Sequence, residues 1–239
     1  MIEKNSIEIN NVTKSFGSNP ILNDCFLSVR SSERYVLLGS NGSGKTTLVK
    51  LLTTLYSPDQ GEVIINGYNS SNHSEQIRTI MGYVGHNSLL YADLTAFENL
   101  QFFSKFYPHI DFDEQFEYLS RILNLSHLIN QKVGKLSHGE QKRLSIMKAM
   151  MSSPSILIMD EPDAGLDVNS IYNLTEQFFP KVINGNMTVF LTTHNSDFAL
   201  SVANTIGILQ SGKIEFQAHS KDEFPELIDK YKSINESVL

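Results

Sequence analysis

Cysteine and tryptophan are the scarcest side chains in this sequence, which has one cysteine and no tryptophan among 239 residues. The single thiol, Cys25, excludes a disulfide framework within the chain. It lies in a mostly apolar run with no histidine or second cysteine nearby, which argues against a catalytic or metal-binding role. We expect Cys25 to pack as a small apolar side chain.

Long apolar runs are also missing. The most apolar stretches, such as residues 155–159 and 187–191, are far shorter than the ~20 residues that a membrane-spanning helix needs. Residues 1–5 lack the basic start and apolar stretch of a signal peptide. These absences predict a cytoplasmic protein, which would work at the cytoplasmic face of a membrane only if another protein held it there.

The sequence has no surplus of basic residues. It carries 26 acidic side chains against 19 Lys and Arg, for a net charge of −7. Proteins that bind the phosphate backbone of nucleic acids need an excess of Lys and Arg, so we expect no nucleic-acid partner. A single nucleotide, which needs positive potential only locally, is compatible with this balance.

The order of apolar residues predicts an α/β core interrupted by a helical insertion. Alternating or continuous apolar runs indicate strands at residues 6–12, 21–29, 34–38, 62–66, 156–159 and 187–191, and a closing hairpin at 205–217. Apolar residues at helical spacing indicate helices at 46–55, within 95–151, and at 169–179, 196–203 and 221–237.

This pattern divides the chain into three parts. We expect the α/β core to comprise residues 1–86 and 154–219, the helical subdomain residues 87–153, and a helical tail residues 220–239. The tail is expected to pack on the chain's own core; a helix that contacts a partner is the alternative.

A phosphate-binding loop is predicted where residues 39–46 read Gly-Ser-Asn-Gly-Ser-Gly-Lys-Thr. Glycines let consecutive backbone N–H groups turn inward around phosphate oxygens, and the next helix directs its positive end at the same point. Lys45 can neutralise the β- and γ-phosphates, and the Thr46 hydroxyl can bind Mg²⁺. The predicted nucleotide-contacting residues are Gly39, Ser40, Asn41, Gly42, Ser43, Gly44, Lys45, Thr46 and Thr47.

Two carboxylates end the apolar run at residues 155–159. Asp160 is expected to hold Mg²⁺, as the strand-end acid of phosphate-loop enzymes does. Glu161 projects past the strand end, where it can polarise a water in line with the γ-phosphate. Many strands end in an acid, so this pattern becomes specific only together with the phosphate loop.

Residues 136–141 read Leu-Ser-His-Gly-Glu-Gln. Here the sequence resembles the ATP-binding-cassette family, whose signature reads Leu-Ser-Gly-Gly-Gln or a close variant. A helix is expected to begin near Glu140, so Ser137 and the backbone around Gly139 can contact a phosphate. In that family the signature covers ATP held by the phosphate loop of a second subunit, which implies a head-to-tail homodimer. His138 departs from the usual glycine, a variation that is expected to alter the γ-phosphate contacts without disabling the site.

The resemblance covers nearly the whole chain and implies further roles. It implies a phosphate-loop NTPase fold with a RecA-like core, an antiparallel β-subdomain and an inserted helical subdomain, with ATP and Mg²⁺ as cofactors. Phe16 matches the aromatic residue that stacks on adenine, and Asp167 the loop that communicates between cassettes. His194 matches the switch histidine that reaches the γ-phosphate, and joins Lys45 and Glu161 as the expected catalytic residues.

A second departure concerns residue 86. The family usually has a glutamine there, near Mg²⁺ and the transporter interface, whereas this sequence has His86. Histidine can donate or accept a hydrogen bond and, when neutral, can contact a metal, although no second ligand is near in sequence. Residues 83–86 (Tyr-Val-Gly-His) and 94–100 are similar to the ATPase subunit of the haem exporter used in cytochrome c maturation.

The resemblance implies an ATPase that drives separate membrane permease subunits, with haem export as the narrower hypothesis. Leu89, Leu90 and Tyr91 are candidates for the coupling surface; alternatively they close the core of the helical lobe. Another exporter, of drugs, lipids or polysaccharides, is an alternative function. A soluble ATPase of iron–sulfur cluster assembly is a further one, whereas a small-molecule kinase has no use for the signature.

Overall fold

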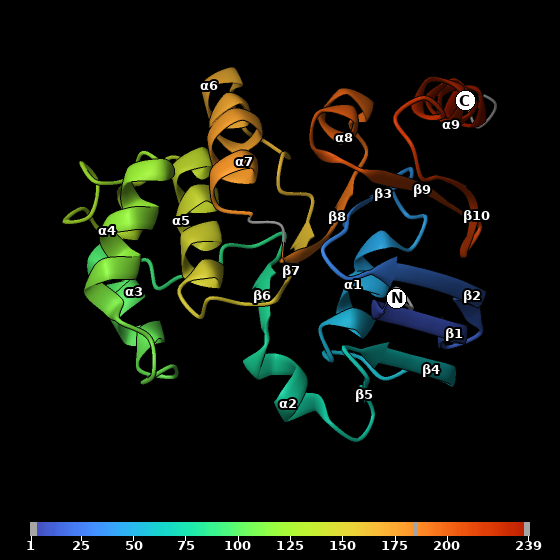
Figure 1. Ribbon diagram of the computed structural model, residues 1–239, viewed down its shortest axis with the longest axis horizontal. Helices are drawn as coiled ribbons and strands as arrows, with labels where there is room; N and C mark the ends of the chain where they lie inside the picture. The colour runs from blue at the N-terminus through green and yellow to red at the C-terminus, as the bar shows by residue number, and fades with distance from the viewer. Residues whose placement is uncertain (1–3, 184–185, 237–239) are drawn as a thin grey trace.

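Two β-sheets form the centre of the molecule, whose computed structural model describes residues 4–183 and 186–236 (Figure 1). Residues 1–3 of the predicted core and residues 237–239 of the predicted tail lie outside the described residues. The larger sheet has six strands in the order β10-β9-β3-β8-β7-β6. Its strands are β3 (Arg34–Leu38), β6 (Met81–Val84), β7 (Ile156–Asp160), β8 (Thr188–Thr193), β9 (Thr205–Gln210) and β10 (Lys213–Ala218).

The smaller sheet has four antiparallel strands in the order β2-β1-β4-β5. They are β1 (Asn5–Phe16), β2 (Asn19–Arg30), β4 (Gln60–Ile65) and β5 (Tyr68–Asn69). β1 and β2 exceed the predicted strands because their ladder continues, through several register shifts, as far as the turn at Gly17. The predicted fold class, an α/β core with an antiparallel β-subdomain, is confirmed.

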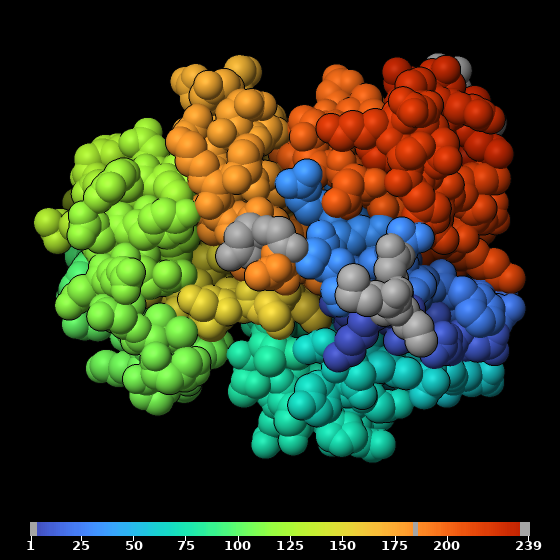
Figure 2. Space-filling model, viewed as in Figure 1, coloured from blue at the N-terminus to red at the C-terminus, as the bar shows by residue number. Residues whose placement is uncertain are grey.

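The helices lie on both faces of the larger sheet. α1 (Lys45–Leu52) and α2 (Ser74–Thr79) contribute to the core shared with the smaller sheet, whereas α8 (Ser196–Val202) and α9 (Phe224–Glu236) contribute to the core of the opposite face. α3 (Ala96–Ser104), α4 (Phe112–Ile122) and α5 (His138–Met150) lie side by side as a lobe, which is green to yellow in Figures 1 and 2. None of the described helices is long and apolar enough to cross a membrane.

Several sequence predictions need correction. β5, α2 and β6 were not predicted, because each is short and none carries a long apolar period. The predicted helix at residues 169–179 is instead α6 (Val168–Tyr172), a π-helical stretch (Asn173–Phe178) and α7 (Phe179–Lys181). Pro180 lacks the N–H that a regular helical ladder needs there. Within the predicted helical lobe, the Phe106 side chain does not pack in the core but is 67% exposed.

Alternation along the central strands supplies two separate cores. In β3, Val36 and Leu38 face the core shared with the helical lobe, whereas Tyr35 and Leu37 face the core shared with α1 and the smaller sheet. Successive strand side chains point to opposite faces, so a strand buried on both faces is apolar throughout. Cys25 lies in the second core, and burial raises the pKa of its thiol to about 11, as its packing role predicts.

Candidate nucleotide-binding site

The register of the parallel strands brings the predicted motifs to one edge of the larger sheet. Leu38 pairs with Thr193, Asp160 pairs with Thr192, and the neighbouring strand β6 ends at Val84. The residues after these strand ends begin the phosphate loop, the Glu161 turn, the His194 turn and the segment that contains His86. In open α/β sheets, ligands bind outside the carboxyl ends of the strands.

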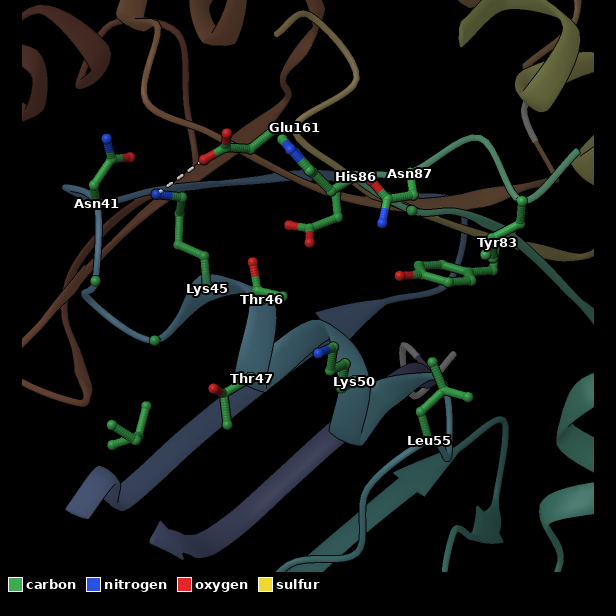
Figure 3. A pocket seen from close by; sticks show the side chains of 16 residues that line it. Asn41, Lys45, Thr46, Thr47, Lys50, Leu55, Tyr83, His86, Asn87 and Glu161 are labelled. Carbon is green, nitrogen blue, oxygen red and sulfur yellow. Dashed lines mark ion pairs between the residues drawn. The ribbon is translucent and has the colours of Figure 1, made fainter. Parts of the chain in front are cut away.

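A cavity of about 740 Å³ lies at this edge (Figure 3). The predicted residues that line it are Asn41, Gly42, Gly44, Lys45, Thr46, Thr47, His86, Asp160 and Glu161. Residues that line it without having been predicted are Ile21, Lys50, Leu55, Tyr83, Gly85, Asn87 and Leu89. The other predicted contact residues, Phe16, Gly39, Ser40, Ser43, Ser137, Gly139, Asp167 and His194, do not line it.

The phosphate loop needs its glycines for two different reasons. Gly44 has a φ of 109°, which side chains rarely adopt, and it is the N-cap of α1. A Cβ on Gly39 would lie 2.5 Å from Ser43 Oγ and 3.0 Å from the Leu209 carbonyl oxygen. The loop therefore packs tightly against β9 while its backbone turns toward the cavity.

Lys45 extends back along this loop. Its Nζ donates hydrogen bonds to the carbonyl oxygens of Gly39 at 2.8 Å and Ser40 at 3.1 Å. The same atom lies 3.2 Å from Glu161 Oε1, the ion pair drawn in Figure 3. Only 5% of the lysine is exposed, so its charge acts in a poorly solvated place, where it is electrostatically stronger than in water.

The two carboxylates have different surroundings. Asp160 is 1% exposed and accepts a hydrogen bond from Thr192 Oγ1 at 2.7 Å, which fixes its orientation. Glu161 is partly exposed, and its Oε1 lies 3.7 Å from His194 Nδ1. The φ of Glu161 is 48°, an uncommon value for a non-glycine residue, of the kind found where a side chain must be aimed.

The donors around Thr46 fit a magnesium ion. Thr46 and Asp160 line the same cavity, and hydroxyl and carboxylate oxygens are the ligands that Mg²⁺ prefers. His86 lines this cavity too. The described residues contain no group of three or more His, Cys, Asp or Glu side chains placed to hold a metal by themselves. The role of His86 stays a prediction.

The signature residues lie in another part of the chain. Ser137 caps α5 in a reciprocal capping box with Glu140, so the helix begins at His138 rather than near Glu140 as predicted. The His138 ring lies against Gly165, where a Cβ would come within 3.1 Å of Nδ1. A histidine in place of the usual glycine is thus accommodated next to a residue without a side chain.

The loop that contains Asp167 adjoins the signature. Arg143 of α5 donates a hydrogen bond to Ser170, and a Cβ on Gly139 would lie 3.2 Å from the Ser170 hydroxyl. Asp167 accepts a hydrogen bond from the Ser170 backbone N–H at 2.7 Å, which lowers the pKa of this carboxyl. These two predicted elements form one unit, which does not line the cavity at the phosphate loop.

Phe16 lies at the end of β1 and is 47% exposed. Its ring contacts the edge of Tyr56, with 5.5 Å between the ring centroids, and Lys14 Nζ lies 5.8 Å from its centroid. An exposed, supported ring is suited to stacking on a base, and the adenine contact stays a prediction.

Helix α5 holds the loop of residues 85–89 through hydrogen bonds that the sequence does not predict. Lys142 Nζ donates to the Gly85 carbonyl at 3.2 Å, and Lys148 Nζ donates to the Leu89 carbonyl at 3.2 Å. Burial lowers the pKa of Lys142, and it lowers that of Lys148 to about 8. The helix that carries the signature is therefore tied to one wall of the cavity.

This geometry is that of a phosphate-loop nucleotide-binding domain, and comparison with known proteins agrees. The family model described as ABC transporter matches residues 22–164, so the chain belongs to the ABC transporter family. Its fold is that of the ABC ATPase domain. It is similar to a structure titled "Structure of ATP binding subunit of ABC transporter", with a TM-score of 0.85, 24% identity, and 95% of this chain and 98% of that chain covered.

A second similar structure is a dimeric ATP-binding cassette in a post-hydrolysis state, bound to ADP and Pi. Its TM-score is 0.80 at 24% identity, over 89% of this chain and 98% of that one. At this level of identity the likeness describes the fold alone.

Two curated relatives are import proteins. The sulfate/thiosulfate import ATP-binding protein CysA of Mesostigma viride is 32% identical over 88% of this chain and 61% of its own length. The spermidine/putrescine import ATP-binding protein PotA of Legionella pneumophila is 33% identical over 87% of this chain and 58% of its own length. The chain thus spans about three fifths of the length of these relatives.

Proposed function

We propose that the chain binds ATP with Mg²⁺ and hydrolyses it, and that two copies close head-to-tail over two nucleotides to drive membrane permease subunits. The observation that supports this most directly is the meeting of Lys45, Asp160, Glu161 and His194 at one sheet edge. These are a phosphate-binding cation, a metal-binding acid and two groups able to orient water, the set that phosphoryl transfer needs.

Each side chain has a proposed part in that chemistry. Lys45 and the loop N–H groups bind the β- and γ-phosphates. Thr46 and Asp160 hold Mg²⁺, which when bound offsets charge on the phosphate oxygens. Glu161 accepts hydrogen bonds from the attacking water and orients it, and His194, beside Glu161, contacts the γ-phosphate.

A second copy is proposed because one chain does not bring its own signature into the cavity. The signature and Asp167 form a separate unit, and next to them Val168 is 83% exposed and Tyr172 is 58% exposed. Apolar side chains so exposed are suited to burial in an interface. The chain that supplies Ser137 would then be a partner copy in head-to-tail contact.

The test of this proposal is ATP turnover by the purified chain across a range of protein concentrations. Phosphate release should require Mg²⁺, and the specific activity should rise with concentration until the dimer is saturated. Turnover without Mg²⁺ would contradict the proposed metal role. A specific activity that does not change with concentration, from a protein that stays monomeric, would contradict the shared site.

The proposed docking surface for the permease is an exposed aromatic ridge, formed by Tyr91, Phe102 and Phe106. These residues are 51%, 38% and 67% exposed. The Phe102 ring packs edge-on against the rings of both Tyr91 and Phe106. Leu90 packs against the core, which agrees with the alternative given for it rather than with a place on the coupling surface, so a charge at Leu90 would damage the fold. The backbone of Tyr91 is held by α3, because its N–H donates a hydrogen bond to Asn99 Oδ1 at 2.8 Å.

We predict that Tyr91→Glu separates transport from hydrolysis. A charge in the middle of an apolar contact is expected to lower co-purification with the permease, and transport, by about tenfold or more. The ATPase activity of the isolated chain should stay within about twofold, because hydrolysis uses other groups. Tyr68→Glu, on the exposed face of β5, is the matched control. Normal transport by Tyr91→Glu would remove the ridge from the interface.

We propose that the domain works at the cytoplasmic face of a membrane, held there by the permease. Two hypotheses for the cargo differ in direction. The segment around Gly85 and His86 favours haem export, whereas the names of the curated relatives favour import of small solutes. The permease that co-purifies, assayed in vesicles for haem export and for solute uptake, decides between them.

A further inference from the structure

Helix α9 covers one end of the larger sheet, beside α8 (Figures 1 and 2). Its apolar face is formed by Phe224, Leu227, Ile228 and Tyr231, which are at most 6% exposed and belong to the main core. The described part of the tail thus packs on the chain's own core, as predicted. Packing explains the three aliphatic and phenyl side chains, but it leaves the hydroxyl of Tyr231 to be explained.

That hydroxyl reaches the turn that carries the switch histidine. Tyr231 is 4% exposed, and its OH donates a hydrogen bond to the backbone carbonyl oxygen of His194 at 3.3 Å. The His194 side chain itself is 52% exposed and makes the 3.7 Å contact with Glu161. The histidine is therefore held by its backbone rather than by burial of its ring.

The backbone on either side of His194 is anchored by other groups. Thr193 Oγ1 donates to Asp163 Oδ2 at 2.9 Å and accepts from the Asn195 backbone N–H at 3.0 Å. Asn195 Oδ1 then caps α8 by accepting from the Phe198 N–H at 3.1 Å. The carbonyl between these anchors is bound from a separate element, α9.

We propose that Tyr231 is a positioning residue for His194, through which the C-terminal helix sets the rate of hydrolysis. The direction of a side chain follows from the orientation of its backbone, so a carbonyl held by Tyr231 restricts where the imidazole can lie relative to Glu161. This inference rests on the proposed role of His194 in hydrolysis. It gives the tail a function in addition to packing: a partner that displaced α9 would slow turnover without touching the nucleotide.

The experiment compares Tyr231→Phe with the unmodified full-length chain in kcat, in KM for Mg²⁺-ATP and in Tm. Removing one hydroxyl should lower kcat about two- to tenfold, the factor that corresponds to a single hydrogen bond. KM should not change, because Tyr231 does not line the nucleotide cavity. Tm should fall by less than about 4 °C, because the ring and its packing are retained.

Tyr118→Phe is the matched control, because the Tyr118 hydroxyl also donates to a backbone carbonyl, that of Lys181 at 2.9 Å, on the helical side of the molecule. It should leave kcat unchanged. If Tyr231→Phe and Tyr118→Phe have the same kcat, the inference is wrong. His194→Ala, assayed alongside, distinguishes failure of the proposed function from failure of this inference. Normal turnover by His194→Ala contradicts the proposed catalytic role of His194. Loss of turnover in His194→Ala together with normal turnover in Tyr231→Phe contradicts only the positioning role of Tyr231.

Discussion

Glu161→Gln is expected to lower ATP turnover by about a hundredfold or more, while the affinity for ATP stays within about threefold of the unmodified chain. The amide keeps the size of the side chain and still accepts a hydrogen bond, but it is a far weaker base. ATP binding depends on the loop N–H groups and Lys45, which the substitution leaves in place. Phosphate release and equilibrium binding of ATP, measured on the same preparation, check both halves of this expectation.

The ion pair in the structure sharpens the prediction for binding. Glu161 lies 3.2 Å from Lys45 Nζ, so the carboxylate competes with phosphate for the lysine. Its neutralisation removes that competitor, and any change in ATP affinity should be toward tighter binding. Glu117→Gln, an exposed carboxylate-to-amide change on α4, is the control and should alter neither quantity. Unimpaired turnover by Glu161→Gln would exclude Glu161 from the reaction.

The cavity-forming half of the site was predictable because its signals are local. A glycine-rich segment after an apolar run, and a pair of acids after another, each fix their chemistry within a few residues. The parallel pairing of β3, β7 and β8 then brings these strand ends together without further information. This is why Lys45, Asp160 and Glu161 meet where the sequence suggests.

Other parts of the site depend on contacts that no local pattern encodes. The Tyr231–His194 hydrogen bond joins residues 37 positions apart, and the Lys142–Gly85 bond joins residues 57 apart. Tyr231 has the same helical spacing as its purely packing neighbours, so its hydroxyl is not distinguished by position. The short strand β6, which carries Tyr83 to the cavity wall, could not be predicted either, because four residues show too little periodicity.

His86 and His138, the two residues that depart from the family's motifs, both lie in surroundings that their own motifs do not specify. His138 lies against Gly165, where a Cβ would crowd the imidazole, and this pairing joins two segments that the sequence alone does not connect. His86 lines the cavity, and its loop is fixed from α5 through the hydrogen bond that Lys142 donates to the Gly85 carbonyl. The surroundings of each histidine thus include a residue from another motif. The effect of either departure on the site therefore depends on those neighbouring residues.

Lys45→Met is expected to lower the affinity for ATP by about a hundredfold, and with it the turnover at any practical ATP concentration. Lys45 is the charged group that reaches back along the phosphate loop, and methionine keeps the unbranched stem while removing the charge. Unlike Glu161→Gln, this variant should fail at the binding step. Equilibrium binding of Mg²⁺-ATP, measured by calorimetry, distinguishes the two.

Folding should be affected much less than binding. The carbonyl oxygens of Gly39 and Ser40 lose a donor and Glu161 loses its ion-pair partner, which is destabilising, but the cost of burying a charge that is only 5% exposed is also removed, which offsets part of that loss. Tm should therefore stay within about 4 °C, and Lys181→Met, an exposed change on α7, should alter neither Tm nor affinity. If Lys45→Met bound ATP within tenfold of the unmodified chain, the N–H groups of the loop would hold the phosphates unaided. The lysine would then act only on the transition state, as Glu161 is proposed to do.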